Sequence, residues 1–280
     1  MTWFQAMLLA VLQGASELFP VSSLGHTVLV PALLRWHVDR TDPTFLAFVV
    51  ALHLGTALAL VAFYADDWAR IVRALVASVV RGKLSDDPCE KLGWLLVVGT
   101  IPVALLGVFF QEPVRRFFGS SAIVSCFLIV NAFIMFAGEA LRRRASGSRE
   151  LDRLTWSDAV KVGCSQGAAL LPGISRSGSS IVAGLLLGLR HDDAARYSFL
   201  LATPVILAAS VLEIPKLFEP AAHAALAQSA AGCVLAGVTA YASVAFLTRW
   251  FHSHDLRPFG WYCLIFGSSC LALALAKVIS

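Results

Sequence analysis

The sequence holds two short polar segments that are enclosed by apolar residues, QGASELFPVSSLGH from Gln13 and PGISRSGSS from Pro172. In the first segment, Gln13 and Glu17 are four residues apart and share one helix face, so they could hold a cation or orient a nucleophile. Ser23 and His26 are three residues apart and can also face the same way. A serine hydroxyl is a weak nucleophile until a base takes its proton. Either Glu17 or His26 could take that proton, and the other could act as the acid.

The second segment has the features of an anion-binding site. Small residues such as Gly173 allow backbone amides to approach an anion closely, and the guanidinium of Arg176 is a fork of donors suited to phosphate oxygens. Hydroxyl groups that could bind the same phosphate occur in both segments, at Ser22, Ser175, Ser177 and Ser180. Serines that precede a helix can also act only as its N-caps. From the residues alone, this site fits an enzyme or a transporter.

The composition of the chain is that of a membrane protein. Of its 280 residues, 58% are hydrophobic and 14% are charged, and the mean hydropathy is +0.76. Soluble domains have about 45–50% apolar and about 25% charged residues. A soluble α/β enzyme, a coiled coil and a disordered chain are therefore excluded. The net charge of +4 is too small to indicate a nucleic acid as partner.

Six apolar segments are long enough, or nearly so, to cross a bilayer core, which needs about 20 helical residues. These segments are Thr44–Tyr64, Leu92–Gln111, Phe117–Gly138, Tyr197–Leu212, Pro220–Thr248 and Pro258–Ala276. Two further regions, Met1–Leu34 and Leu154–Leu189, are broken by proline and polar residues into halves that are too short to span. We predict two re-entrant helix–break–helix hairpins, because a broken backbone at membrane depth survives only inside protein or beside a wet cavity.

The positively charged residues predict how the chain is oriented. Lys and Arg collect in the loops of one face, chiefly within residues 70–91 and 142–153, and the richer face is expected to be cytoplasmic. Both termini would then lie outside. The mixed charges and apolar residues of Asp66–Lys91 predict an amphipathic helix at the membrane surface, followed by a loop.

The two halves of the chain resemble each other. Both broken regions contain Gln-Gly-Ala, then a proline six or seven residues on, then a serine three residues after the proline. Each hairpin precedes three spans, and because three is odd the second copy starts on the opposite face. We predict an all-α polytopic membrane protein, a single membrane domain (1–280) whose halves, 1–145 and 154–280, form an inverted repeat.

The hairpins of an inverted repeat enter from opposite faces and can meet. The helices that restart near Ser22 and Ser175 would then point their N-termini, which attract phosphate, at each other. Glu17 and Arg176 would lie in the middle of this arrangement. Ionisable groups at membrane depth are costly and are functional candidates, although a purely structural ion pair is the alternative.

Both segments are similar to signatures of the undecaprenyl-diphosphatase family, the bacitracin-resistance proteins. QGASELFPVSSLGH resembles E/Q-x-x-x-E with P-V-S-S-x-x-H, and PGISRSGSS resembles P-G-x-S-R-S-x-x-T. The later segments HLGT and ARYSFLLATPVILAAS are also similar to the family, so the resemblance covers the whole chain. It implies a phosphatase that removes the terminal phosphate of undecaprenyl diphosphate, which recycles the carrier lipid for peptidoglycan synthesis and confers bacitracin resistance.

The resemblance also implies roles for single residues. It makes Ser23 the nucleophile, His26 the motif histidine, Arg176 the phosphate-binding arginine, Glu17 the second acidic residue and Gln13 the variable first one. Ser180 stands where the family usually has threonine. Activity that depends on Mg²⁺ or Ca²⁺ is implied too, but Gln13 cannot supply a second negative charge and no cluster of metal ligands indicates a site independently. His53 is expected to pack near the site, and Asn131 to bond between helices.

We therefore predict a phosphatase of the bacterial inner membrane, with its site at the crossing of two hairpins and open to the periplasm. Its partners would be the bilayer and a polyprenyl diphosphate lipid. Attack by Ser23 and attack by a directly activated water both remain open. The alternative function is a transporter or flippase of the polyprenyl phosphate that uses the same anion site. The oligomeric state is open, with a homodimer among the alternatives.

Overall fold

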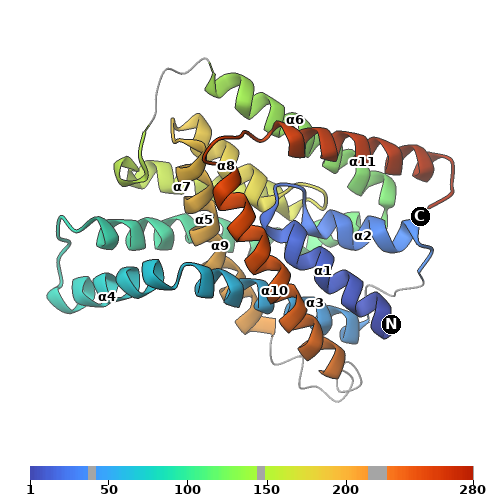
Figure 1. Cartoon of the computed structure of the whole chain (residues 1–280), viewed down its shortest axis with the longest axis horizontal. Coiled ribbons are helices and arrows are strands. Elements are labelled where there is room, and N and C mark those ends of the chain that lie inside the picture. The colour runs from blue at the N-terminus through green and yellow to red at the C-terminus, as the bar shows by residue number, and fades with distance from the viewer. Residues whose placement is uncertain (37–41, 144–148, 214–225, 280) are drawn as a thin grey trace.

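The computed structural model describes residues 1–36, 42–143, 149–213 and 226–279. Within these ranges the chain forms α-helices joined by turns (Figure 1). In chain order, the helices are α1 (Trp3–Leu18), α2 (Ser23–Leu33), α3 (Pro43–Phe63), α4 (Ala65–Arg81), α5 (Pro88–Arg115), α6 (Ser121–Arg142), α7 (Trp156–Ser165), α8 (Arg176–Leu186), α9 (His191–Glu213), α10 (Leu226–Trp250) and α11 (Arg257–Leu275).

Six of the described helices, α3, α5, α6, α9, α10 and α11, are long and apolar enough to cross a membrane, which confirms the six predicted spans. The predicted start of the third span at Phe117 was wrong. Residues Arg116–Gly119 form a 3₁₀ turn, and α6 begins only at Ser121, where the hydroxyl of Ser120 accepts a hydrogen bond from the Ile123 amide. The predicted start of the fifth span at Pro220 lies outside the described residues.

Both broken hairpins are present. In the first, α1 ends at Leu18 and α2 restarts at Ser23. In the second, α7 passes into a 3₁₀ turn, Gln166–Leu170, before α8 restarts at Arg176. Proline lacks the amide hydrogen that a continuous helix needs, and serine is a good N-cap, so Pro20 and the serine after it can end one helix and begin the next.

Asn131 of α6 joins the two breaks. Its side-chain Nδ2 donates to the carbonyl of Pro20 at 3.0 Å, and its Oδ1 accepts from the amide of Ser175 at 3.0 Å. The side chain is completely buried. A break inside a membrane protein exposes backbone groups that must find partners, and one amide side chain satisfies a group from each hairpin. The predicted role of Asn131 as a bond between segments is confirmed.

The two halves pack on each other reciprocally. The first helix of each hairpin lies against a long helix of the other half, α1 on α10 and α7 on α5, while α3 packs with α9 and α6 with α11. Small residues permit this close approach. A Cβ added at Gly14 of α1 would overlap the carbonyl of Ala236 on α10, and one at Gly163 of α7 would overlap the carbonyl of Gly99 on α5.

The predicted amphipathic helix is α4, which packs on α5. Its buried residues include Ile71 and Ser78, and the Ser78 hydroxyl accepts a hydrogen bond from Trp94 of α5 at 2.9 Å. The start of α1 and the end of α11 lie at one end of the molecule, and α4 lies at the other (Figure 1). The position of α4 at a membrane surface, and of the termini outside, stay predictions.

Candidate functional site

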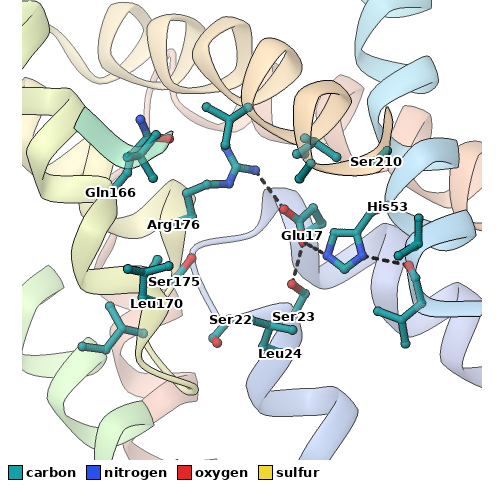
Figure 2. Close-up of a pocket in the computed structure, with 18 residues that line it drawn as sticks. Glu17, Ser22, Ser23, Leu24, His53, Gln166, Leu170, Ser175, Arg176 and Ser210 are labelled. Carbon is teal, nitrogen blue, oxygen red and sulfur yellow. Dashed lines mark hydrogen bonds and ion pairs between the residues drawn. The ribbon is translucent and has the colours of Figure 1, made fainter. Parts of the chain in front are cut away.

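A cavity of about 330 Å³ lies where the two breaks meet. Its polar lining comes mainly from the hairpins, through Glu17, Ser22, Ser23, Gln166, Ser175 and Arg176. His53 of α3 and Ser210 of α9 complete the polar part (Figure 2). The remaining wall is apolar and is formed largely by α3, α5 and α9. The cavity therefore joins a polar centre made by both halves to a hydrophobic surface.

Glu17 is the centre of the polar cluster. Its Oε1 accepts a hydrogen bond from Nη2 of Arg176 at 2.9 Å. Its Oε2 accepts from the Ser23 hydroxyl at 2.6 Å and from Nε2 of Gln13 at 2.9 Å. Nε2 of His53 lies 3.6 Å from the same oxygen (Figure 2). The structure thus brings the predicted nucleophile, carboxylate and arginine together from three different helices.

The local fold explains how Ser23 reaches Glu17. Gln13 and Glu17 lie one turn apart near the end of α1, so they share one helix face, and Glu17 is the one of the two that lines the cavity. The chain then reverses through Ser22, whose φ of 69° is uncommon for a residue other than glycine. This turn places Ser23 at the first position of α2 with its hydroxyl pointing back at the carboxylate. A distance of 2.6 Å is suited to proton transfer between them.

Both helices that restart at the breaks begin at the cavity. Ser22 caps α2 by accepting from the Gly25 amide at 3.2 Å, and Ser175 caps α8 by accepting from the Gly178 amide at 3.1 Å. Both serines also line the cavity. Helix N-termini carry unpaired N–H groups and partial positive charge, which favour an anion beside them. Two such ends and Arg176 make this cavity suited to phosphate.

His26 is turned away from the cluster, toward α11. Its Nδ1 lies 2.7 Å from the Ser22 carbonyl and its Nε2 lies 2.7 Å from the Tyr262 hydroxyl. The ring also stacks on Phe266. The imidazole that the structure brings to Glu17 is instead that of His53, which was expected only to pack near the site.

Three other predicted phosphate-binding residues build the scaffold of the site. Ser177 donates to the carbonyl of Phe19 at 3.1 Å, which ties the start of α8 to the first break. The Ser180 hydroxyl shares a hydrogen bond of 2.6 Å with Ser198 of α9. Gly173 has a φ of 114°, in a region that favours glycine, and packs against α6. Their contacts orient α8 and its arginine.

Gln166 and Ser210 were not among the predicted site residues. Gln166 belongs to the second Gln-Gly-Ala, so the repeat was a signal that could have found it. Ser210 is the last residue of ARYSFLLATPVILAAS, where only its polarity in an apolar run distinguishes it. Both side chains line the cavity and are buried, with exposed fractions of 1% and 3%.

The donor set does not by itself form a site for Mg²⁺ or Ca²⁺. These cations take several oxygen ligands, usually including more than one carboxylate or substrate oxygens. No group of three or more His, Cys, Asp or Glu side chains comes together in the described parts of the chain. Within the described lining, Glu17 is the only carboxylate, and the guanidinium of Arg176 already occupies one of its oxygens.

Comparison with known proteins identifies the family of this chain. The family model described as bacitracin resistance protein BacA matches residues 6–269. The undecaprenyl-diphosphatase of Acidiphilium cryptum is 46% identical over 282 residues, covering 98% of this chain and 98% of that protein. Undecaprenyl-diphosphatase 2 of Chromobacterium violaceum is 45% identical, covering 95% of this chain and 97% of the relative. The Mycobacterium avium undecaprenyl-diphosphatase is 43% identical, covering 97% of both. The chain therefore belongs to the bacitracin resistance protein BacA family.

Proposed function

We propose that this protein is an integral-membrane phosphatase that hydrolyses undecaprenyl diphosphate to undecaprenyl phosphate and phosphate. The observation that carries the proposal is the contact of Ser23 and Arg176 with the two oxygens of one carboxylate, Glu17, at 2.6 and 2.9 Å. A nucleophile, a base and an anion clamp are thereby assembled in one cavity. The relatives that carry the name undecaprenyl-diphosphatase identify the substrate.

The proposed reaction begins with attack of the Ser23 oxygen on the terminal phosphorus. The proton of Ser23 passes to Oε2 of Glu17 as the new oxygen–phosphorus bond forms. The bond from phosphorus to the bridging oxygen breaks, and that oxygen leaves on undecaprenyl phosphate with the bonding electrons. Arg176 and the N-termini of α2 and α8 stabilise the charge on the transferred group.

Glu17 then gives the proton that it took from Ser23 to the departing oxygen of undecaprenyl phosphate. Water next hydrolyses the phosphoserine: Glu17 accepts a proton from the attacking water and returns it to the Ser23 oxygen as the bond between that oxygen and phosphorus breaks, which releases phosphate. In the alternative mechanism, Glu17 activates water for direct attack and Ser23 only orients it. Arg176 can serve in both mechanisms without releasing Glu17, because Nη2 holds the carboxylate while Nη1 has no partner in the described structure.

The apolar wall of the cavity would receive the lipid. Val49 of α3, Val103 of α5 and Val205 of α9 contribute to it, and the hydrophobic chain would leave sideways between helices into the bilayer. We further propose that the cavity opens to the periplasm. The collection of Lys and Arg within residues 70–91 and 142–153, which would be cytoplasmic, supports the orientation of the chain on which this proposal depends. Labelling of single cysteines at the helix ends in intact cells tests this orientation.

Phosphate release from undecaprenyl diphosphate by the detergent-purified protein tests the proposed function. Wild type is compared with Glu17→Gln, Ser23→Ala and Arg176→Lys, and with Ser125→Ala, a buried serine of α6, as the control. Release that is lost in the three site variants and kept in the control supports the proposal. If wild type binds the lipid without releasing phosphate, the proposed hydrolysis is wrong, and the polar cluster acts only as an anion-binding site.

Two further measurements separate the open alternatives. Unchanged turnover in Ser23→Ala excludes the covalent mechanism, whereas phosphorylation of Ser23 detected by mass spectrometry after a rapid quench supports it. The divalent-cation requirement implied by the resemblance stays a prediction. It is tested by removing cations with a chelator, then adding Mg²⁺ or Ca²⁺, and measuring both phosphate release and metal binding to the lipid-free protein.

A further inference from the structure

One part of the cavity holds polar atoms that have no hydrogen-bond partner in the described structure. They are Nε2 and Oε1 of Gln166, Oγ of Ser210 and Nη1 of Arg176. A buried polar group without a partner costs about 1–3 kcal/mol, so native proteins leave few of them. Four such atoms around one cavity indicate that the partner is a ligand.

These atoms differ from the cluster around Glu17, where the polar groups already bind one another. Arg176 belongs to both parts, since Nη2 donates to Glu17 while Nη1 is free. In Figure 2 its guanidinium is drawn between Gln166 and Ser210. The cavity therefore has a reaction side, at Ser23 and Glu17, and a second side at Gln166 and Ser210, with the arginine reaching both.

The internal repeat explains why Gln166 is free. It occupies the position in the second Gln-Gly-Ala that Gln13 occupies in the first. Gln13 is bound by Glu17, four residues later, at 2.9 Å. Four residues after Gln166 the chain has Leu170, and the local structure is a 3₁₀ turn instead of a helix. The second glutamine therefore has no carboxylate one turn away to bind, and its amide is available to a ligand.

We propose that Gln166, Ser210 and Nη1 of Arg176 form a second phosphate subsite, which binds the phosphate that stays on the lipid. The proposal rests on the proposed phosphatase function. Amide, hydroxyl and guanidinium hydrogens are all donors to phosphate oxygens. Glu17, the only carboxylate of the described lining, binds the other nitrogen of the arginine. A diphosphate with its terminal group at Ser23 would place its inner group beside the same arginine.

The surroundings of Ser210 fit a phosphate that carries a lipid. Ile206 lies one turn before Ser210 on α9, and both line the cavity. Val205 and Ala209 extend the same wall. A hydroxyl at the edge of an apolar surface matches the junction between a phosphate and the first isoprenoid unit. The subsite would distinguish a lipid diphosphate from a free phosphate, which has no second group to fill it.

The test is inhibition by the two products in Gln166→Glu, which keeps the shape of the side chain and adds a negative charge. We expect the KM for undecaprenyl diphosphate and the inhibition constant of undecaprenyl phosphate to rise together, by about tenfold or more, because a hydrogen bond to a charged group is replaced by repulsion. The value of kcat should change less. Inhibition by inorganic phosphate, which occupies the reaction side, should stay near its wild-type value.

Ser210→Ala provides a second variant that deletes only a hydroxyl, and we expect a smaller rise in the same two constants. Gln228→Glu and Ser229→Ala are the controls, because neither residue belongs to the described lining of the cavity. Gln228 lies at the start of α10 and donates to the Met1 carbonyl. Ser229 is a buried serine whose hydroxyl, like that of Ser210, has no hydrogen-bond partner in the described structure. Thermal unfolding shows that each variant is folded. If Gln166→Glu does not fold, Ser210→Ala decides the outcome.

Unchanged inhibition by undecaprenyl phosphate in a folded variant would overturn the second subsite. An equal loss of inhibition by inorganic phosphate would also overturn it, since the residues would then hold the transferred group. The failure of the proposed function is distinguishable. If wild type releases no phosphate, direct binding of undecaprenyl phosphate in detergent is compared between wild type and variants, and the same rise in Kd is expected.

Discussion

The ion pair between Glu17 and Arg176 should contribute to both stability and catalysis, and Glu17→Gln separates the two effects. The side chains are 7% and 13% exposed. Removing one partner of a buried pair costs about 3–5 kcal/mol, because the other charge is left without compensation. The cavity beside Arg176 admits water, so we expect a loss near the lower end, about 3 kcal/mol. Turnover should fall by about 10²- to 10⁴-fold, the usual contribution of a general base.

The double variant Glu17→Gln/Arg176→Met distinguishes this explanation from simple loss of packing. Replacing both partners of a buried pair by groups of similar size is often neutral. We therefore expect the double variant to recover most of the lost stability and to remain inactive. Unfolding in detergent measures the free energies, and phosphate release measures turnover. A double variant that is less stable than Glu17→Gln would refute the reasoning that an uncompensated charge causes the loss.

Three other predictions follow from contacts outside the carboxylate cluster. Asn131→Ala should lower the free energy of unfolding by about 2–4 kcal/mol and also reduce turnover, because one backbone group in each break loses its partner; normal activity at lower stability would contradict it. Tyr262→Phe should lower the free energy of unfolding by about 1 kcal/mol, because it removes the hydrogen bond to His26. This loss should be part of the larger loss caused by His26→Ala, and thermal unfolding measures both. Gly14→Val should cost about 3 kcal/mol or more by separating α1 from α10, whereas the same change at Gly107, which has open space around it, should be tolerated.

Much of the fold could be predicted from the sequence because its signals are local. A helix that crosses a membrane needs an apolar run of a set length, and all six predicted segments correspond to long apolar helices in the described structure. Prolines followed by serines marked both breaks. The start of α6 was misplaced because Arg116–Gly119 form a 3₁₀ turn. Apolar composition alone does not distinguish a 3₁₀ turn from the first turn of a membrane-spanning α-helix.

Part of the candidate site could also be predicted. Gln13 and Glu17 are four residues apart on one helix, so their contact follows from helix geometry. The repeat placed Glu17 and Arg176 at matching breaks, and an ion pair between them was considered only as the structural alternative to a functional role; the structure forms that pair at 2.9 Å. His26 shows the limit of this reasoning, since spacing allowed it to face Ser23, but in the fold its ring stacks on Phe266 and bonds the hydroxyl of Tyr262, both on α11.

Local patterns along the chain are enough to predict the membrane class, the six spans, the two breaks and the residues at their edges. The packing of distant helices is what places His53 beside Glu17, and what brings Gln166 and Ser210 into the same cavity as Arg176. These side chains come from α3, η3 (Gln166–Leu170) and α9. Spacing along one helix sets which residues share a face, but the rotation of that helix depends on its neighbours. Close contacts such as those at Gly14 and Asn131 set that rotation, and they join segments far apart in the chain.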